Sequence, residues 1–450
     1  MFLSFRFFAY LCIKNLTMKL LHCADLHLGQ ILYQNYDRVD EHEHFFRQLG
    51  GWCRQYAPDV LLVSGDLFDI QQPSAAVKKF FTDTFVELHR QCPDMSIIII
   101  AGNHDSASRL QADAKVWECL GVHIVGVSPS AELLDQPDGW QERFLVRMPS
   151  GYVVALPYMV GNRRALIQTM LDYVGSENTS QLPVIMTGHT TVAGADVTGH
   201  DFEIGKISTQ SAEDMGTGYD YLALGHIHRP QTIGYPLADE ASDEQDYPSG
   251  VARYSGSALH VSCDEKYPHT VSLVEIAEHG GEVHLKRLRI DELRHFYELP
   301  LDGTAASTAE EAIDAVQQFV NQGKTGYIRL RIRYSAILPP DFDQHIYQLL
   351  QGMEEEVRYN PKTIWMGEPQ QSAAPKPVFE VAELQEMTNP MDFIEKTIDQ
   401  YPELDLENLR MDFAEVENEL RQMQEEVKLK KNRKSAPTAE ENVNREGGGL

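Results

Sequence analysis

Four short apolar runs, each followed by a polar loop that contains glycine, constrain the fold of this chain more than any other feature. They cover residues 60–64, 97–101, 184–187 and 221–224. Apolar runs of this length between turn signals are typical of buried strands. Residues 40–56, before the first run, and residues 75–91, between the first two, have a helical pattern. Strands that alternate with helices predict a layered α/β domain whose chemistry gathers at the carboxyl ends of the strands.

The 450-residue chain divides by composition into several parts. A strand-like segment follows Met18, so we expect Met18 to be the natural start. Residues 239–250 are polar and acidic and predict a surface loop, and residues 271–276 and 283–288 predict a hairpin that closes the first domain. We expect a non-native leader at 1–17, the main α/β domain at 18–284, a small α/β unit at 285–367, a linker at 368–377, a helical arm at 378–430 and a disordered tail at 431–450.

The predicted helical arm carries an apolar seam. Its members, in alternating steps of four and three residues, are Leu409, Phe413, Val416, Leu420, Met423 and Val427. Such a spacing places apolar side chains on one face of a long helix. The seam is suited either to docking of a partner helix or to packing against the chain's own domain, and the linker before it favours an independent arm.

Charge and cysteine content limit the classes of function. The chain has 39 Lys and Arg against 67 Asp and Glu, a formal net charge of -28. This argues against nucleic-acid binding by the chain alone, unless cations or a partner supply positive charge. The six cysteines form no C-x-x-C pair, which is typical of reduced thiols in a cytoplasmic protein. No later segment has eighteen consecutive apolar residues, so we expect no membrane span.

Five polar loops that follow apolar runs hold the residues with chemical potential. They read Asp25-Leu26-His27, Gly65-Asp66-Leu67-Phe68-Asp69, Gly102-Asn103-His104-Asp105, Gly188-His189 and Gly225-His226-Ile227-His228. Oxygen and imidazole donors together favour manganese, iron or zinc. Each motif alone is weak, because a lone histidine is usually a core or surface group. Their occurrence together, each after a predicted strand, predicts a metal site.

Cleavage of a phosphodiester fits such a site. The phosphate charge must be neutralised, a water deprotonated and a leaving oxygen stabilised, and two metal ions about 3.5–4 Å apart can do this when a carboxylate bridges them. Asp66 lies after a glycine in mid-sheet, where a backbone without Cβ atoms can approach closely. We therefore expect Asp66 to be the bridge.

The set D-x-H, G-D-x-x-D, G-N-H-D, G-H and G-H-x-H resembles the calcineurin-like metallophosphoesterases, and most closely their nuclease members that act with a coiled-coil ATPase. The resemblance is specific over the first domain and weak after it. It implies a four-layer α/β fold, a β-sandwich flanked by helices, with the small unit as a capping domain and a C-terminal helical arm. It also implies two divalent metal ions, usually Mn²⁺.

The resemblance assigns roles to individual residues. One ion would be held by Asp25, His27, Asp66 and His228, and the other by Asp66, Asn103, His189 and His226. His104 would stabilise developing charge and assist the leaving oxygen. Asp105 would orient His104 from behind. Asp69 would order the loop or position the substrate.

One basic feature offsets the acidic total. Arg329, Arg331 and Arg333 alternate with apolar residues on a predicted strand, which places three guanidinium groups on one face. They form either a DNA-phosphate track or an outer face paired with Asp and Glu.

We therefore expect an enzyme, a two-metal DNA nuclease with 3′–5′ exonuclease and single-strand or hairpin endonuclease activity, used in DNA repair and recombination. The chain lacks the phosphate loop of an ATPase, so we expect that it does not hydrolyse ATP itself. The resemblance implies a separate coiled-coil ATPase as partner, with this chain a homodimer inside a heterotetramer. Two alternatives stay open: a phosphatase or cyclic-nucleotide phosphodiesterase of the same superfamily, and a scaffold that holds DNA ends.

Overall fold

The computed structural model describes residues 17–33, 35–130, 139–197, 209–237 and 242–367. Contacts divide the chain into Met1–Met366 and Gly367–Leu450. Only the first unit is described, apart from residue 367. The expected leader except residue 17, the linker, the helical arm and the tail therefore lie outside the described residues.

The first of two large sheets has seven strands. Their order is β12 (Glu244–Tyr247), β15 (Val283–Arg289), β14 (Thr270–Ile276), β1 (Met18–Cys23), β4 (Val60–Ser64), β5 (Ser96–Ile100) and β6 (Val122–Val125). Strands β1, β4, β5 and β6 are parallel to one another, and β14 pairs antiparallel with β1. The parallel strands therefore end along one edge of the sheet.

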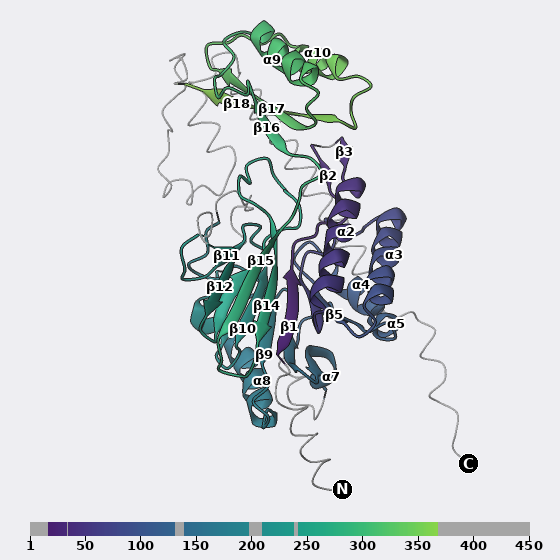
Figure 1. Ribbon diagram of the computed structural model, residues 1–450, viewed down its shortest axis with the longest axis vertical. Helices are drawn as coiled ribbons and strands as arrows, with labels where there is room; N and C mark the ends of the chain where they lie inside the picture. The colour runs from purple at the N-terminus through teal and green to yellow at the C-terminus, as the bar shows by residue number, and fades with distance from the viewer. Residues whose placement is uncertain (1–16, 34, 131–138, 198–208, 238–241, 368–450) are drawn as a thin grey trace, which may run out of the picture. The chain divides into compact units, whose positions relative to one another are not determined.

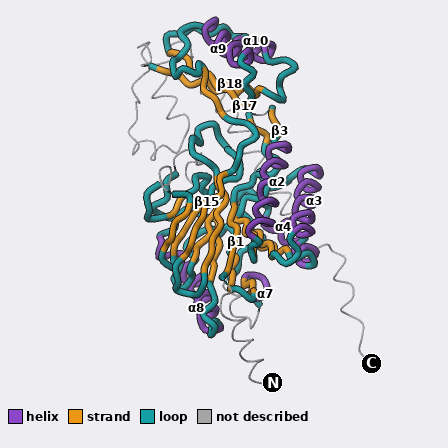
Figure 2. The backbone as a smooth tube through the Cα atoms, viewed as in Figure 1, coloured by secondary structure: helices purple, strands orange, loops and turns teal. Residues whose placement is uncertain are grey.

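The second sheet has six strands. Their order is β11 (Gln231–Thr232), β13 (Val251–Tyr254), β10 (Tyr221–Gly225), β9 (Val184–His189), β8 (Gly151–Ala155) and β7 (Leu145–Met148). Strands β8, β9, β10 and β13 are parallel. The two sheets pack face to face as a sandwich, with the strands drawn in orange in Figure 2.

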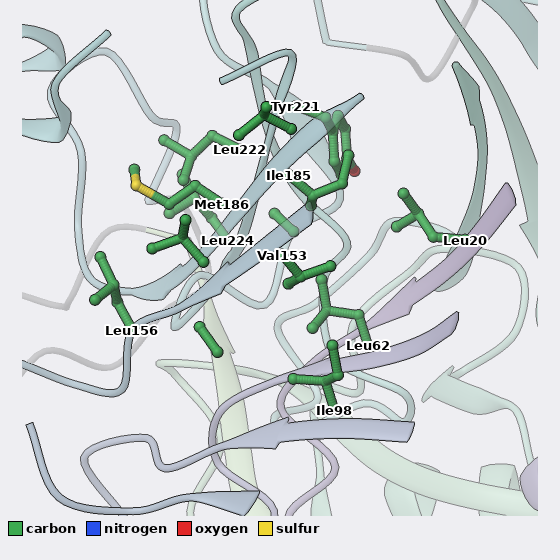
Figure 3. Packing of buried hydrophobic residues seen from close by; sticks show 14 of the residues in the cluster. Leu20, Leu62, Ile98, Val153, Leu156, Ile185, Met186, Tyr221, Leu222 and Leu224 are labelled. Carbon is green, nitrogen blue, oxygen red and sulfur yellow. The ribbon is translucent and has the colours of Figure 1, made fainter. Parts of the chain in front are cut away.

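The core between the sheets follows from the alternation of side chains along a strand. Leu20, Leu62 and Ile98 point toward the second sheet and pack in one cluster with Ile185 and Tyr221, as Figure 3 shows. The neighbouring residues of the same strands belong to a second cluster under the helices. Both faces of the first sheet are therefore apolar, which explains why its parallel strands read as continuous apolar runs.

Helices cover the outer faces of the sandwich (Figure 1). On the first sheet these are α2 (Val39–Tyr56), α3 (Ala75–Gln91), α4 (Ala107–Ala112) and α5 (Ala114–Glu118). On the second sheet α8 (Arg164–Glu177) packs through one apolar stripe, next to the 3₁₀ turn η1 (Ala212–Met215), while α7 (Gln141–Phe144) precedes β7. The order helix, sheet, sheet, helix confirms the four-layer α/β class. No described helix combines the length and the apolar character required to cross a bilayer.

A small α/β unit follows β15. Its parallel sheet has the order β16 (Phe296–Leu299), β17 (Gly326–Arg333) and β18 (Val357–Met366), and α9 (Ala309–Asn321) and α10 (Phe342–Leu349) pack on it. The Thr308 hydroxyl caps α9 by accepting a hydrogen bond from Glu311 N–H. The sequence pattern predicts helices at 308–321 and 342–350 and strands at 327–334 and 356–365 in this unit, and α9, α10, β17 and β18 agree within one residue at each end. Strand β16 was not predicted.

A buried polar cluster joins this unit to α2. The Glu41 carboxylate, 3% exposed, accepts hydrogen bonds from Tyr327 Oη at 2.5 Å and Arg358 Nη1 at 3.1 Å, both from the small sheet. Its other oxygen accepts from Arg38 Nε at 3.0 Å. Because buried charges are stable only when paired, this cluster holds the small sheet on the α2 end of the main domain.

Two sequence expectations need comment. Residues 239–250 were expected to form a loop, but β12 lies within them and pairs with the edge of β15. Cross-strand ion pairs Lys286–Glu244 and His284–Asp246 favour this pairing. Strand β15 also crosses the expected boundary between residues 284 and 285. The division into domains stays a prediction.

Candidate metal centre

The five polar loops meet at one end of the sandwich because each follows a parallel strand. Strands β1, β4 and β5 of the first sheet and β9 and β10 of the second supply them. Within the described part of the chain, the donors form three close groups: Asp25, His27 and His228; Asp66, His189 and His226; and His27, Asp69 and His104. Donor atoms in each group lie within 4.8 Å of one another. The structure thus brings together residues up to 203 positions apart in sequence.

In the first group, each histidine is oriented through its Nδ1 atom. His27 Nδ1 lies 3.2 Å from Asp69 Oδ1, and His228 Nδ1 lies 3.0 Å from Glu265 Oε1. Nδ1–H therefore donates to a carboxylate, which leaves Nε2 with its lone pair as the metal-binding atom. His27 Nε2 is buried and has no hydrogen-bond partner among the described residues. A buried lone pair of this kind fits a metal ion.

The second group converges on the side-chain amide of Asn103. Asn103 Oδ1 lies 2.9 Å from His189 Nε2 and 2.9 Å from His226 Nδ1. His189 Nδ1 donates to the Ser64 carbonyl oxygen at 2.8 Å, which assigns its Nε2 to the site. Three donor atoms from three loops therefore point to a common position, as in a ligand set for a borderline divalent cation.

Asp66 lies between the two groups. Its Oδ2 is 3.2 Å from His189 Nε2 of the second group and 4.0 Å from His27 Nε2 of the first. Its Oδ1 accepts a hydrogen bond from His104 N–H at 2.8 Å, which fixes the carboxylate plane. A carboxylate that faces both donor groups has the position that a bridging ligand requires.

Burial makes the charges of this centre strongly interdependent. Burial raises the pKa of Asp25 to about 6, although nearby His189 opposes the shift. Burial also disfavours the charged form of Asp66, but the positive charge of His189 holds the pKa of Asp66 well below its usual range. For His189, burial alone would lower the pKa. The negative charge of Asp66 and its hydrogen bond outweigh this effect of burial, so the pKa of His189 is raised to about 9. Carboxylates that need such compensation in a buried site are suited to divalent cations.

The backbone of the centre is strained where its donors are attached. Asp25, His27, Asp66 and His226 have φ values of 51°, 45°, 47° and 97°. Non-glycine residues in this region cost about 1–3 kcal/mol each and cluster at functional sites. The backbone N–H of His226 donates to Asp25 Oδ1 at 2.9 Å, which ties two of these strained residues together. The rest of the fold holds these donors in their positions.

Two glycines make room for the donor side chains. A Cβ atom on Gly65 would lie 2.1 Å from His189 Nδ1, and one on Gly102 would lie 2.1 Å from Asp66 Oδ1. Contacts this short do not occur, so only glycine is compatible with these positions of the donors. The glycines of the G-D and G-N motifs are therefore steric requirements of the site.

His104 lies at the exposed edge of the centre and contacts Asp69 rather than Asp105. Its Nδ1 donates to the Asp69 carbonyl oxygen at 2.8 Å, so Nε2 is the ring atom left for a substrate. Asp105 instead accepts three backbone N–H bonds, from Leu67 at 3.1 Å, Phe68 at 2.9 Å and Gly102 at 2.9 Å. Through these bonds Asp105 ties the G-D-x-x-D loop to the G-N-H-D loop. An orienting effect of Asp105 on His104 stays a prediction.

The sequence left the role of Asp69 uncertain. In the structure Asp69 contacts both histidines of its own donor group, His27 and His104. Its side chain meets His27 and its main-chain oxygen meets His104. Glu265, which supports His228, was not identified from the sequence. It is 2% exposed, and burial raises its pKa to about 8. It lies 37 residues after its histidine and outside any recognised motif, so the sequence carried no signal for it.

The three arginines of β17 lie opposite its apolar face but are not equivalent. Arg329 is 8% exposed and forms ion pairs with Asp264 at 3.0 Å and Glu298 at 3.2 Å. Arg331 is half-buried and donates to two backbone carbonyls. Arg333 is exposed. Two of the three guanidinium groups therefore have partners inside the protein.

Comparison with known proteins agrees with this geometry. Residues 18–230 match the family model for calcineurin-like phosphoesterases. The D subunit of the SbcCD nuclease of Rhodobacter capsulatus is 29% identical over 321 residues, which cover 64% of this chain and 73% of that protein. Its namesake in Escherichia coli K12 is 28% identical, with coverage of 57% and 65%, and that of Bacillus subtilis is 28% identical, with coverage of 59% and 68%.

The matched segment thus spans about two thirds of these relatives, and slightly less for the Escherichia coli protein. Among solved structures, a dimetal phosphatase from Danio rerio aligns with 61% of this chain and 99% of its own length. Its TM-score of 0.34 and identity of 11% support no inference. The segment that matches the family model contains all the donor loops of the centre: residues 18–230 match calcineurin-like phosphoesterases, and the chain is similar to the D subunits of SbcCD nucleases.

Proposed function

We propose that this protein is a metal-dependent DNA nuclease, a phosphodiesterase with 3′–5′ exonuclease and single-strand or hairpin endonuclease activity. The observation that carries the proposal is the position of Asp66 between two histidine-rich donor groups. Such a pair of sites matches the needs of phosphodiester cleavage. The similarity to proteins named as SbcCD nuclease subunits supports DNA as the substrate.

The donor chemistry assigns the proposed ligands. Asp25, His27, Asp66 and His228 would hold one ion, and Asp66, Asn103, His189 and His226 the other. When bound, two divalent ions neutralise the phosphate and lower the pKa of a coordinated water. We propose Mn²⁺, which accepts the mixture of oxygen and imidazole donors found here.

His104 is proposed to act on the leaving side of the phosphate. Its ring is held through Nδ1 by the Asp69 carbonyl oxygen, and Nε2 is left to donate a proton or a hydrogen bond to the leaving oxygen. Its N–H meanwhile fixes the Asp66 carboxylate. One residue therefore links the proposed bridging ligand to the substrate side of the centre.

The acidic surface implies help in binding DNA. With a net charge of -28, the chain as a whole repels the phosphates of DNA. We propose that a coiled-coil ATPase like SbcC supplies basic surface and controls access, with two copies of this chain in a heterotetramer. The proposal places the protein in the cytoplasm. In the small unit, Arg333 is the best candidate for a DNA contact, since Arg329 and Arg331 have internal partners.

A phosphatase or cyclic-nucleotide phosphodiesterase is the second candidate, because the same centre would cleave small phosphoesters. The small α/β unit joined to α2 by the buried Glu41 cluster favours the nuclease, since a minimal phosphatase does not need it. A DNA-end scaffold is disfavoured, because every expected donor is present and converges.

The test is cleavage of end-labelled duplex and hairpin DNA by the full chain with Mn²⁺, Mg²⁺ or EDTA. We expect Mn²⁺-dependent shortening that Asn103→Ala abolishes and His104→Ala slows by about 10²–10⁴-fold. The matched controls Asn321→Ala and His345→Ala, on helices of the small unit, should cleave normally.

Two other outcomes have defined meanings. No DNA cleavage with the ATPase partner and ATP, but turnover of a small phosphodiester, would replace the nuclease by the phosphatase. Binding of DNA ends without either activity would favour the scaffold.

A further inference from the structure

A cavity of about 480 Å³ lies beside the metal centre. Its wall combines the loop around Cys263 and Tyr267 with residues of the small sheet, including Phe296 and Arg329. Glu265, whose carboxylate holds His228, is also part of this wall. The volume falls in the usual range of sites for small organic ligands. None of the proposed metal ligands lines the cavity, so it is a separate space that shares one wall residue with the centre.

Aromatic side chains form much of the cavity wall. The rings of Phe296 and Tyr327 stack at 4.6 Å with an interplanar angle of 13°. Tyr33 meets Tyr327 edge-on at 6.0 Å, and Tyr297 also lines the space. Aromatic walls favour a flat, unsaturated ligand, because every nucleobase or similar ring has a face that can stack.

The charges of the wall disfavour a phosphate. Three carboxylates, from Glu265, Glu292 and Glu298, face two cations, Lys266 and Arg329. Both cations are already paired with Glu298, Lys266 at 2.7 Å and Arg329 at 3.2 Å. An anionic group entering this space would therefore find both cations of the wall already committed to a carboxylate.

Unpartnered donors in the wall distinguish a neutral heterocycle from an organic cation. Tyr267 Oη and Arg329 Nε have no hydrogen-bond partner within the described ranges. Each residue is only 8% exposed. A buried donor without a partner is costly, and an ammonium group has no acceptor to offer. A nucleobase supplies carbonyl oxygens and ring nitrogens that accept such bonds.

We propose that this cavity binds a nucleobase with its sugar. The base comes either from an unpaired nucleotide of DNA held at the metal centre or from a free nucleoside. The DNA source rests on the proposed nuclease function, and Glu265, shared by the two sites, places the cavity beside the scissile position. Holding one unstacked nucleotide there would align the neighbouring phosphate with the metal centre.

The first experiment does not depend on nuclease activity. Binding of deoxyadenosine, thymidine and deoxyribose 5-phosphate to the full chain is measured by calorimetry in EDTA. We expect the nucleosides, but not the sugar phosphate, to bind. Cys263→Phe, which fills the cavity, should abolish binding, whereas Cys119→Phe, at an exposed cysteine elsewhere, should not. Tyr267→Phe removes only an unpartnered hydroxyl and should weaken binding without unfolding the chain.

The second experiment uses duplexes in which one nucleotide near the scissile phosphate is abasic. We expect the missing base at one position to lower kcat/KM by about tenfold in the wild type, as loss of one stacked base does. In the Cys263→Phe variant, the abasic nucleotide should change kcat/KM little, because the cavity is already filled. If the wild type does not cleave DNA at all, the nuclease proposal fails and the nucleoside titration alone decides on the cavity.

The outcomes of the two experiments distinguish a base from DNA, a free nucleoside, and a cavity that binds neither. Nucleoside binding without an abasic effect supports a site for free nucleosides, and an abasic effect supports a site for a DNA base. The proposal is overturned if nucleosides bind equally well to Cys263→Phe and Tyr267→Phe. It is also overturned if no nucleoside binds and the abasic effect is absent or the same in wild type and both variants.

Discussion

Replacing Glu41 by glutamine tests whether the buried polar cluster holds the small sheet on α2. The carboxylate pairs with Arg38, which is 2% exposed, and with Arg358, which is 4% exposed. Removing one partner of a buried ion pair costs about 3–5 kcal/mol, because the other charge is left uncompensated. Glutamine keeps one acceptor oxygen, so we expect a cost at the lower end of this range, about 3 kcal/mol. This cost corresponds to a change of about 100-fold in the equilibrium constant for detachment of the small sheet from α2.

Native-state hydrogen exchange measures this opening locally. We expect protection of the β17 and β18 amides to fall by about 100-fold in Glu41→Gln, because these strands carry Tyr327 and Arg358. The amides of β4 and β5 lie in the core of the main domain and should keep their protection.

The matched control is Glu43→Gln, an exposed glutamate on the same helix, which should change neither set of amides. A fall in protection of less than about threefold in β17 and β18 would refute the reasoning. An equal fall in β4 and β5 would show that the cluster stabilises the whole unit rather than the junction.

Three further predictions concern the metal centre. Gly102→Ala places a Cβ 2.1 Å from Asp66 Oδ1; we expect loss of Mn²⁺ binding by calorimetry and about 1–3 kcal/mol of destabilisation. Gly51→Ala, a helix position with no atom within 4 Å of the new Cβ, should instead stabilise by up to about 1 kcal/mol, and similar results for both variants would contradict the steric argument. Glu265→Gln should weaken Mn²⁺ binding by about 10–100-fold, with exposed Glu282→Gln as control; unchanged affinity would remove its supporting role. Mn²⁺ at 100 times its Kd should raise the unfolding free energy by about 2.7 kcal/mol, reversed by EDTA; no shift would mean that the folded centre does not bind the ion.

The pattern of apolar residues within a short segment predicted those helices and strands whose burial follows from their own sequence. Strands β4, β5, β14 and β15 of the first sheet and helix α3 were predicted almost residue by residue, because their apolar runs and periodicity are local properties. Strand β12 was missed, because its first three residues are polar and exposed and become a strand only by pairing with β15. An edge strand of this kind depends on a partner about forty residues away, which no local window contains.

The same distinction holds for the site. Motifs predicted the donors that the structure brings together, because ligand chemistry leaves a short signature around each glycine. They did not predict which groups orient these donors. The Ser64 carbonyl that fixes His189 is a backbone atom, and any residue type would provide it. The contacts of Asp105 likewise depend on how two loops meet, which their sequences do not specify.

The distribution of donors over two sheets has a consequence for the order of events during folding. Asp25 accepts from the backbone of His226, a partner 201 residues later, so neither donor group is complete in a nascent chain that ends before residue 226. Contacts of such sequence separation form late, because a long loop must close first. The chain would therefore gain metal affinity only after both halves of the sandwich have docked, and early intermediates would be unable to cut the nucleic acid around them.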